Sequence, residues 1–224
     1  GPNKTPQATG SDLVIDDILS AVEYAKQNAN VDTNRIYLVG VSGGGYTTLQ
    51  AIAKLPDVWA AASAWASISD LSAWHAECTA FGNRYAKMVE LSCGGAPGES
   101  DSVDAQYRHR SPVNFLLNVK SVPVDINAGI HDGFSGSVPV SHSINAFNVL
   151  AQDSDKILDS AIEYIVGNKL IPEELETNEA DPYYGPKKPL LRRESNNARL
   201  TIFEGGHEII PNAALHWLQQ HSKK

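Results

Sequence analysis

Apolar residues recur along this chain with two periods, and the two periods alternate. Residues 36–41, 58–66, 122–130 and 199–203 form short, mostly apolar runs, which are typical of strands in a buried sheet. Between these runs, apolar residues recur every three or four positions, as they do on one face of a helix. The predicted helices are 12–28, the stretch after Ser42, a short one from Ser111, one with Ile144, Phe147 and Leu150, about 155–166, and one through Leu215 and Leu218.

This alternation predicts an α/β fold with a mostly parallel sheet flanked by helices, in a single domain over residues 1–224. The signal is mixed from 67 to 112, where no one period dominates. Residues 171–197 are rich in proline and charge and are long for a loop in a compact domain. We therefore expect them to form a surface insertion before the last strand.

The turn between the first predicted strand and the following helix carries Gly40-Val41-Ser42-Gly43-Gly44, a match to G-x-S-x-G. A serine on such a sharp bend is lifted clear of the sheet, and the residues two positions to either side must lack side chains to avoid collision. The helix N-terminus beneath it favours developing negative charge. The alternative is an ordinary glycine-rich turn. A dinucleotide site needs G-x-G-x-x-G and a P-loop needs a following Lys, and the turn has neither.

A serine nucleophile needs a base, and that base needs an acid to hold it. Among seven histidines, His207 is the candidate base because it follows a strand in a Gly-Gly loop. Asp132 follows an earlier strand and gives the chain order Ser42, Asp132, His207. Asp70 is a rival acid, but its position predicts a helix cap. Asp125 lies mid-strand, where its side chain would point into the packing of the sheet.

With these pieces in order, the chain resembles the α/β-hydrolase catalytic domain of the prolyl oligopeptidase (S9-like) serine peptidase family over most of residues 12–221. The resemblance rests on Arg35-Ile36, Ser42, Arg110-Ser111-Pro112, Val122-Pro123, His131-Asp132-Gly133, Ser137-Val138-Pro139-Val140 and Gly205-Gly206-His207. It implies an α/β-hydrolase fold with the triad Ser42, Asp132 and His207. It also implies cleavage of an ester or peptide acyl bond through an acyl-enzyme, with a small acyl, peptide or acylated-carbohydrate substrate.

The chain departs from that family before Ser42. Only 41 residues precede it, so the N-terminal strands of the fold are expected to be missing. The loop that supplies a second donor to the oxyanion hole is absent, which leaves the Gly43 N–H as the obvious donor. The alternative function is therefore a non-catalytic, hydrolase-derived module, in which a partner chain or a second copy covers the open edge of the sheet.

Net charge and the lengths of apolar runs argue against some classes of partner. The formal net charge of −8 argues against nucleic acid, and no run approaches eighteen apolar residues, which argues against a membrane span. No metal and no organic cofactor is expected. Cys78 and Cys93 allow either a disulfide, which would fit a secreted or periplasmic protein, or two free thiols. Four aromatic residues are candidate substrate contacts, with core or surface packing as the alternative: Trp65, Trp74, Tyr183 and Tyr184.

Overall fold

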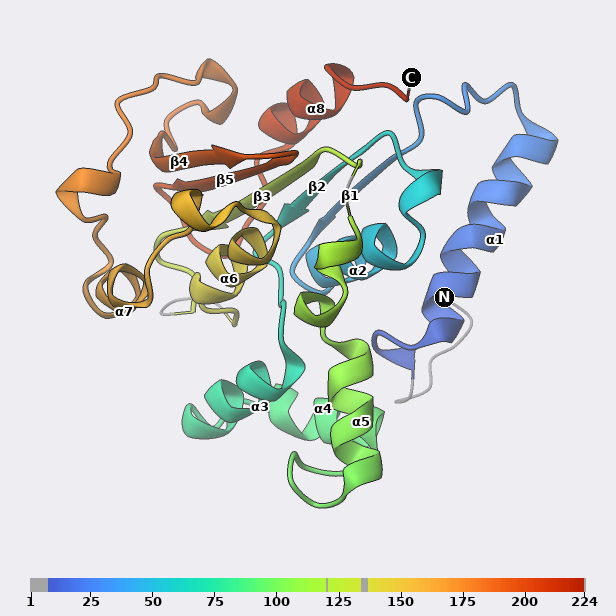
Figure 1. Ribbon diagram of the computed structural model, residues 1–224, viewed down its shortest axis with the longest axis horizontal. Helices are drawn as coiled ribbons and strands as arrows, with labels where there is room; N and C mark the ends of the chain where they lie inside the picture. Colours follow the sequence, from blue (N-terminus) through green and yellow to red (C-terminus); the bar gives the residue numbers. More distant parts are fainter. Residues whose placement is uncertain (1–7, 120, 134–136, 224) are drawn as a thin grey trace.

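A five-stranded sheet forms the centre of the protein, as the computed structural model shows (Figure 1). The structure describes residues 8–119, 121–133 and 137–223. The strand order is β1-β2-β3-β5-β4, and only β4 runs antiparallel to its neighbour. Because the other four strands are parallel, their carboxyl ends meet at one edge of the sheet. The chain thus has the mostly parallel, helix-flanked sheet of an α/β-hydrolase, as its sequence predicts.

The elements follow one another in the expected alternation, with three helices in the segment whose signal was mixed. In chain order they are α1 (Asp12–Asn28), β1 (Tyr37–Val41), α2 (Gly43–Lys54), β2 (Ala61–Trp65), α3 (Leu71–Ala80), α4 (Tyr85–Cys93), α5 (Asp101–Arg110), β3 (Val124–Gly129), α6 (Ser141–Leu150), α7 (Asp159–Asn168), β4 (Pro189–Ser195), β5 (Ala198–Phe203) and α8 (Pro211–Gln219). Short 3-10 turns at Pro112–Asn114 and Leu116–Asn118 replace the helix expected from Ser111.

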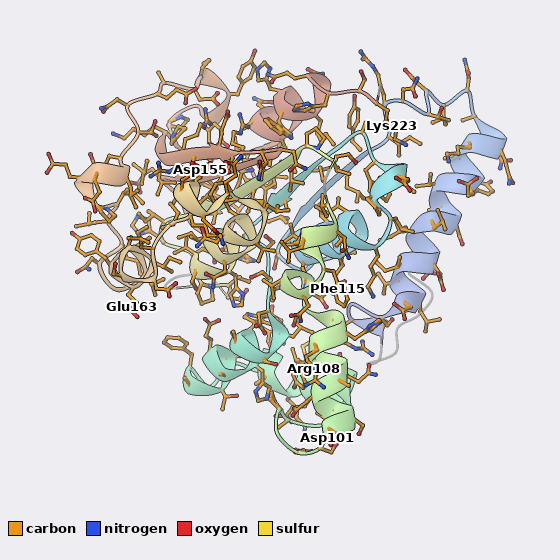
Figure 2. All side chains as sticks on the ribbon, viewed as in Figure 1. Asp101, Arg108, Phe115, Asp155, Glu163 and Lys223 are labelled. Carbon is orange, nitrogen blue, oxygen red and sulfur yellow. The ribbon has the colours of Figure 1, made fainter. Side chains whose placement is uncertain are left out.

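The two faces of the sheet have different chemistry. Helices α2 and α6 cover one face, where side chains such as Leu49, Ile126 and Phe147 are completely buried in the main hydrophobic core. Helix α8 covers the other face (Figure 1), where Trp65 and Phe203 pack against Ala213 and Ala214. Figure 2 shows side chains filling the spaces between the ribbons.

The α8 face also holds a buried polar network. Asp125 is fully buried in β3, as its mid-strand position predicts, and accepts hydrogen bonds from Ser63 Oγ and Asn127 Nδ2. Arg199 on β5 donates from Nε to the same carboxylate over 2.9 Å. The Arg199 guanidinium lies over the Trp217 ring of α8, 4.3 Å from its centroid. This network joins the second, third and fifth strands to the helix that covers them.

Helices α3, α4 and α5 lie together, away from the sheet (Figure 1), around a small core of their own. Asp70 caps α3 as expected, since its carboxylate accepts from the backbone N–H groups of Ser72 and Ala73. Both cysteines are buried in this core as free thiols, so the disulfide is absent and burial raises the pKa of each thiol to about 11.

Two further sequence expectations need correction. The helix expected at 155–166 begins later, at Asp159, after a 3-10 turn at Asp153–Asp155. The segment 171–197, expected as a surface insertion, ends in β4, which pairs with β5 and belongs to the sheet. Its charged residues hid the strand pattern: Arg192 on β4 pairs with Asp181 and Glu179 from the same segment. Within the described residues, no helix combines the length and apolarity that crossing a membrane requires.

Candidate active site

Ser42 stands at the bend between β1 and α2 with φ 59° and ψ −122°, a strained conformation for a residue other than glycine. Its N–H donates to the Trp65 carbonyl over 2.9 Å, and its carbonyl accepts from the Tyr46 N–H. Strand β2 and helix α2 thus hold the backbone on both sides of the bend. Such strain persists where the surrounding structure enforces it, and it is frequent at functional sites.

The glycines around Ser42 have unequal roles. A Cβ on Gly40 would lie 2.4 Å from the backbone of Gly44, so Gly40 must lack a side chain, as predicted. A Cβ on Gly44 would meet no atom within 4 Å, which corrects the expectation for that position. The close approach on the helix side falls instead at Gly45, where a Cβ would lie 2.5 Å from the Trp65 carbonyl oxygen.

Gly43 is the first residue of α2. The first N–H groups of a helix have no acceptor within the helix, and they carry the positive end of its dipole. The Gly43 N–H therefore lies directly beside Ser42 and is available to an anionic oxygen.

Asp132 and His207 are in direct contact although 75 positions separate them. His207 Nδ1 lies 2.9 and 3.0 Å from the two carboxylate oxygens of Asp132. Asp132 is 1% exposed and also accepts from the Gly133 N–H. The hydrogen bond to Asp132 raises the pKa of His207 above its usual 6.5, against the opposing effect of burial. An ionised carboxylate can only accept, so Nδ1 carries the proton and Nε2 of the neutral ring is a proton acceptor.

Backbone contacts bring the two loops together at the ends of β3 and β5. The N–H of His131 donates to the Gly205 carbonyl and that of Ile130 to the Phe203 carbonyl, each over 3.0 Å. A Cβ on Gly129 would lie 2.4 Å from the backbone of Gly205, so only glycine permits this approach. The position of His207 is therefore set by main-chain packing as well as by Asp132.

Ser42, Asp132 and His207 follow the carboxyl ends of β1, β3 and β5, at one edge of the sheet. Within the part of the chain that the structure describes, no hydrogen bond joins Ser42 to His207. Catalytic hydrogen bonds are often long before substrate binds. The structure therefore contains the acid–base pair and the strained serine as two separate, preformed units.

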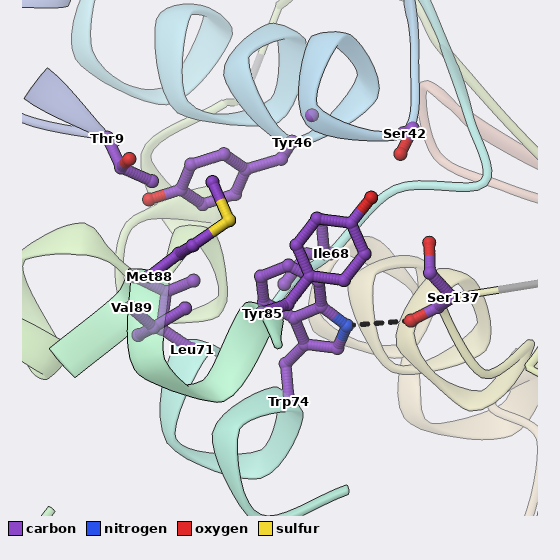
Figure 3. A pocket seen from close by; sticks show the side chains of 11 residues that line it. Thr9, Ser42, Tyr46, Ile68, Leu71, Trp74, Tyr85, Met88, Val89 and Ser137 are labelled. Carbon is purple, nitrogen blue, oxygen red and sulfur yellow. Dashed lines mark hydrogen bonds between the residues drawn. The ribbon is translucent and has the colours of Figure 1, made fainter. Parts of the chain in front are cut away.

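A cavity of about 280 Å³ opens beside Ser42 (Figure 3). It lies between α2, the α3–α4 helices and the residues just before α1. Among the described residues, its lining is mostly apolar and aromatic and holds no charged side chain: Thr9, Ser42, Gly43, Tyr46, Ile68, Leu71, Trp74, Tyr85, Met88, Val89 and Ser137. Trp74 stacks on Tyr85, with ring centroids 5.4 Å apart, and donates from Nε1 to the Ser137 carbonyl. A neutral, apolar group therefore suits the cavity.

The four aromatic candidates have three different positions. Trp74 lines the cavity, and its contact with substrate stays a prediction. Trp65 and Tyr184 are 0% and 1% exposed in the core cluster beneath α8, which corrects the expectation that they contact substrate. Tyr183 stacks on His216 of α8, with centroids 3.6 Å apart, and is not among the cavity residues.

Tyr46, Tyr85 and Met88 line the cavity but were not predicted from the sequence. Tyr46 follows Ser42 by one helical turn, a spacing that places it on the same side of α2 and could have signalled its role. Tyr85 and Met88 lie on α4, in the segment of mixed signal. No sequence pattern connects them to Ser42, because the fold alone brings α4 across from α2.

Four of the other histidines, including His131 beside Glu204, each contact a carboxylate side chain. His75 lies inside α3 and contacts Glu90, while His142 contacts Glu77 over 2.9 Å. His109 contacts Asp12. Among the described residues, no cluster of three or more metal-binding side chains occurs.

Comparison with known proteins identifies a family and structures of similar fold. The model of the prolyl oligopeptidase family matches residues 9–164. An acylaminoacyl peptidase from Pyrococcus horikoshii is similar in structure, with 26% identity and a TM-score of 0.52 over 64% of this chain and 21% of that one. A puromycin-hydrolysing peptidase from Mycobacterium tuberculosis has 26% identity and a TM-score of 0.53 over 67% of this chain and 21% of that one. The match thus spans about a fifth of each of these solved chains.

Proposed function

The chain belongs to the prolyl oligopeptidase family, and on that premise we propose that it is a serine hydrolase whose triad is Ser42, His207 and Asp132. The observation that carries the proposal is the pair of short contacts between His207 Nδ1 and the Asp132 carboxylate. This contact fixes the tautomer that a general base needs, with Nε2 as proton acceptor. The strained Ser42 and the adjacent cavity supply the nucleophile and a place for substrate.

In the proposed first half-reaction, Ser42 Oγ attacks the carbonyl carbon of the substrate while His207 Nε2 takes the hydroxyl proton. The Gly43 N–H donates to the oxyanion that forms. The carbonyl then re-forms, the bond to the leaving group breaks, and His207 returns the proton to that group. In the second half-reaction water attacks the acyl carbon and gives a proton to His207 Nε2. The bond between that carbon and Ser42 Oγ then breaks, His207 returns the proton to Ser42 Oγ, and the acid is released. Asp132 orients His207 and stabilises its charged form throughout.

The substrate we propose is a neutral acyl group with an apolar side chain, carried by a peptide or an ester. The uncharged, aromatic lining of the cavity supports this choice. An acylaminoacyl peptidase of 25% identity and TM-score 0.50, matched over 64% of this chain and 21% of its own, has been solved with Z-Gly-Gly-Phe-chloromethyl ketone. That compound places an aromatic side chain next to its reactive carbonyl, and we infer that the cavity of this chain accepts such a side chain. Acylated carbohydrates are the less favoured alternative.

Labelling with a fluorophosphonate tests the nucleophile. We expect Ser42 to be labelled, Ser42→Ala to lose the label, and the matched control Ser20→Ala, on an exposed position of α1, to keep it. Equal labelling of wild type and Ser42→Ala would contradict the assignment. Hydrolysis of phenylalanine p-nitroanilides, p-nitrophenyl acetate and acetylated sugars would then separate peptide, ester and carbohydrate substrates.

One observation favours a second candidate, a non-catalytic assembly module. Among the described strands, β1 pairs only with β2, and Val39 at this edge is 51% exposed. An edge strand offers unpaired backbone groups to a partner strand, in a second copy or in another protein. Light scattering would show a dimer that Val39→Lys dissociates. If the wild type and Val39→Lys are both monomers, two copies do not assemble through this edge.

A further inference from the structure

The cavity beside Ser42 is built from three parts of the chain that are distant in sequence. Thr9 comes from the turn before α1, Tyr46 from α2, and Leu71 from the start of α3. Figure 3 shows Thr9 beside the Tyr46 ring, with Leu71 across from them. A cavity of this kind keeps its shape only if something holds its walls at fixed spacing.

Arg110, the last residue of α5, contacts two of these walls. Its guanidinium Nη1 donates to the Thr9 carbonyl, and its Nε and Nη2 donate to Gln106 Oε1 over 3.1 and 3.0 Å. Its own carbonyl accepts from the Tyr46 hydroxyl over 2.7 Å and from Gln50 Nε2. Arg110 is 6% exposed, so these bonds are shielded from water.

The wall formed by Thr9 and Tyr46 is also tightly packed. Gly10 has φ +61°, and a Cβ there would overlap the Tyr46 hydroxyl. The guanidinium of Arg110 therefore holds the Thr9 carbonyl next to the point where the chain packs against the hydroxyl end of Tyr46.

Ser111 contacts the third wall. Its hydroxyl donates to the Tyr107 carbonyl over 2.8 Å and accepts from the Leu71 N–H over 2.9 Å. Two residues on, the Val113 N–H donates to the Ser69 carbonyl over 3.1 Å. Ser111 is 1% exposed. The first turn of α3, with Leu71 and Trp74, is thereby fixed to the same segment that holds Thr9 and Tyr46.

We propose that Arg110 and Ser111 are positioning residues that hold the three cavity walls in register and so set the preference for large, apolar acyl groups. This inference rests on the proposed function of the cavity, and it assigns a role to a motif that the triad leaves unused. Neither residue touches substrate. Without the hydrogen bonds of Arg110 or Ser111, the wall at Thr9 or at Leu71 moves outward. An aromatic side chain of the substrate then loses contacts that a methyl group never makes.

The test measures binding rather than turnover, in the full chain carrying Ser42→Ala. NMR titrations give the dissociation constants of N-acetyl-phenylalaninamide and N-acetyl-alaninamide. The preference of the cavity is the constant of the alanine compound divided by that of the phenylalanine compound. We expect wild-type walls to favour the phenylalanine compound and Arg110→Met to reduce that preference at least fivefold. Arg110→Lys, which retains one donor toward Thr9, is expected to restore part of it.

The matched control is Arg108→Met, the same chemical change on an exposed position of the same helix (Figure 2). It is expected to change the ratio less than twofold. If Arg110→Met fails to fold by circular dichroism, Ser111→Ala and the exposed Gln106→Ala replace it, and each is expected to reduce the preference at least twofold.

An unchanged ratio in the folded Arg110 and Ser111 variants would overturn the inference, as would a wild-type cavity that binds neither compound. Equal weakening of both compounds would also overturn it, because that result indicates general loosening rather than positioning. Failure of the proposed function is a separate result. It would appear as an unlabelled Ser42 in the wild-type chain, and it leaves the measured ratio unaffected.

Discussion

Trp74 Nε1 donates a hydrogen bond of 2.9 Å to the Ser137 carbonyl, and this contact joins α3 to the segment that follows Asp132. The same indole stacks on Tyr85 and lines the cavity beside Ser42. The wall that would hold the substrate is therefore tied to the chain segment that carries the proposed catalytic acid. Substitutions at Trp74 should separate these two roles.

Trp74→Ala should remove the cavity wall and the hydrogen bond together. Truncation of a buried aromatic side chain costs about 3–5 kcal/mol in unfolding free energy. We expect kcat/KM for a phenylalanine nitroanilide to fall by more than for p-nitrophenyl acetate, because the acetyl group does not reach the wall. Trp74→Phe keeps an aromatic ring in the wall, although a smaller one, and loses the hydrogen bond, so it should retain most of the selectivity. Similar losses on both substrates would refute a role in selectivity.

Asp132→Asn should change both the rate and its pH dependence. The neutral amide no longer stabilises the imidazolium. It also has only one oxygen that can accept from His207 Nδ1, where the carboxylate has two. In comparable triads this change lowers kcat by about 10⁴. Asp132 raises the pKa of His207, so the acidic limb of the wild-type pH–rate profile should lie above pH 6.5 and move to lower pH in the variant. An unmoved limb would exclude His207 as the titrating base.

The same pKa shift predicts how stability depends on pH. A group whose folded-state pKa is raised stabilises the folded protein fully below its unfolded pKa, about 6.5 for His. That contribution disappears as the pH rises through the folded-state pKa. His207→Ala should therefore destabilise the protein more at pH 5.5 than at pH 9, as measured by urea unfolding. A destabilisation of equal size at both values would contradict the Asp132 contact as its cause.

Gly40→Ala and Gly44→Ala form a matched pair within one motif. The Cβ at position 40 would lie 2.4 Å from the Gly44 backbone, whereas the one at 44 meets no atom within 4 Å. We expect Gly40→Ala to cost about 1–3 kcal/mol of stability, as overpacking does, and to abolish labelling of Ser42. Gly44→Ala should fold and be labelled. Loss of labelling in both would show that position 44 also needs glycine for a reason other than space.

The Asp125–Arg199 pair allows a double-mutant test in the buried network. Removing one partner leaves a buried charge alone, so Asp125→Leu is expected to cost about 3–5 kcal/mol. Replacing both residues with leucine removes both charges and should recover much of that loss. Thermal unfolding of the two single variants and the double variant gives the coupling. Additive losses would show that the two side chains act independently.

The fold class and the three residues of the proposed triad could be predicted from sequence alone. Ser42, Asp132 and His207 could be placed because each follows a strand pattern, and the carboxyl ends of parallel strands share one edge whatever the details of packing. Local rules also placed α1 at 12–28 and the Asp70 cap, since helical periodicity and capping depend on neighbours within a few residues.

Tertiary packing sets which residues form the walls of the cavity and which glycines are needed. Trp65 and Trp74 could not be distinguished from sequence. Trp65 is buried under α8 and Trp74 lines the cavity, because they belong to different packing layers. Likewise Gly40 needs its missing side chain and Gly44 does not, although both match the motif. Periodicity reports which residues share a face of one element. Only the packing of elements distant in sequence determines what that face meets.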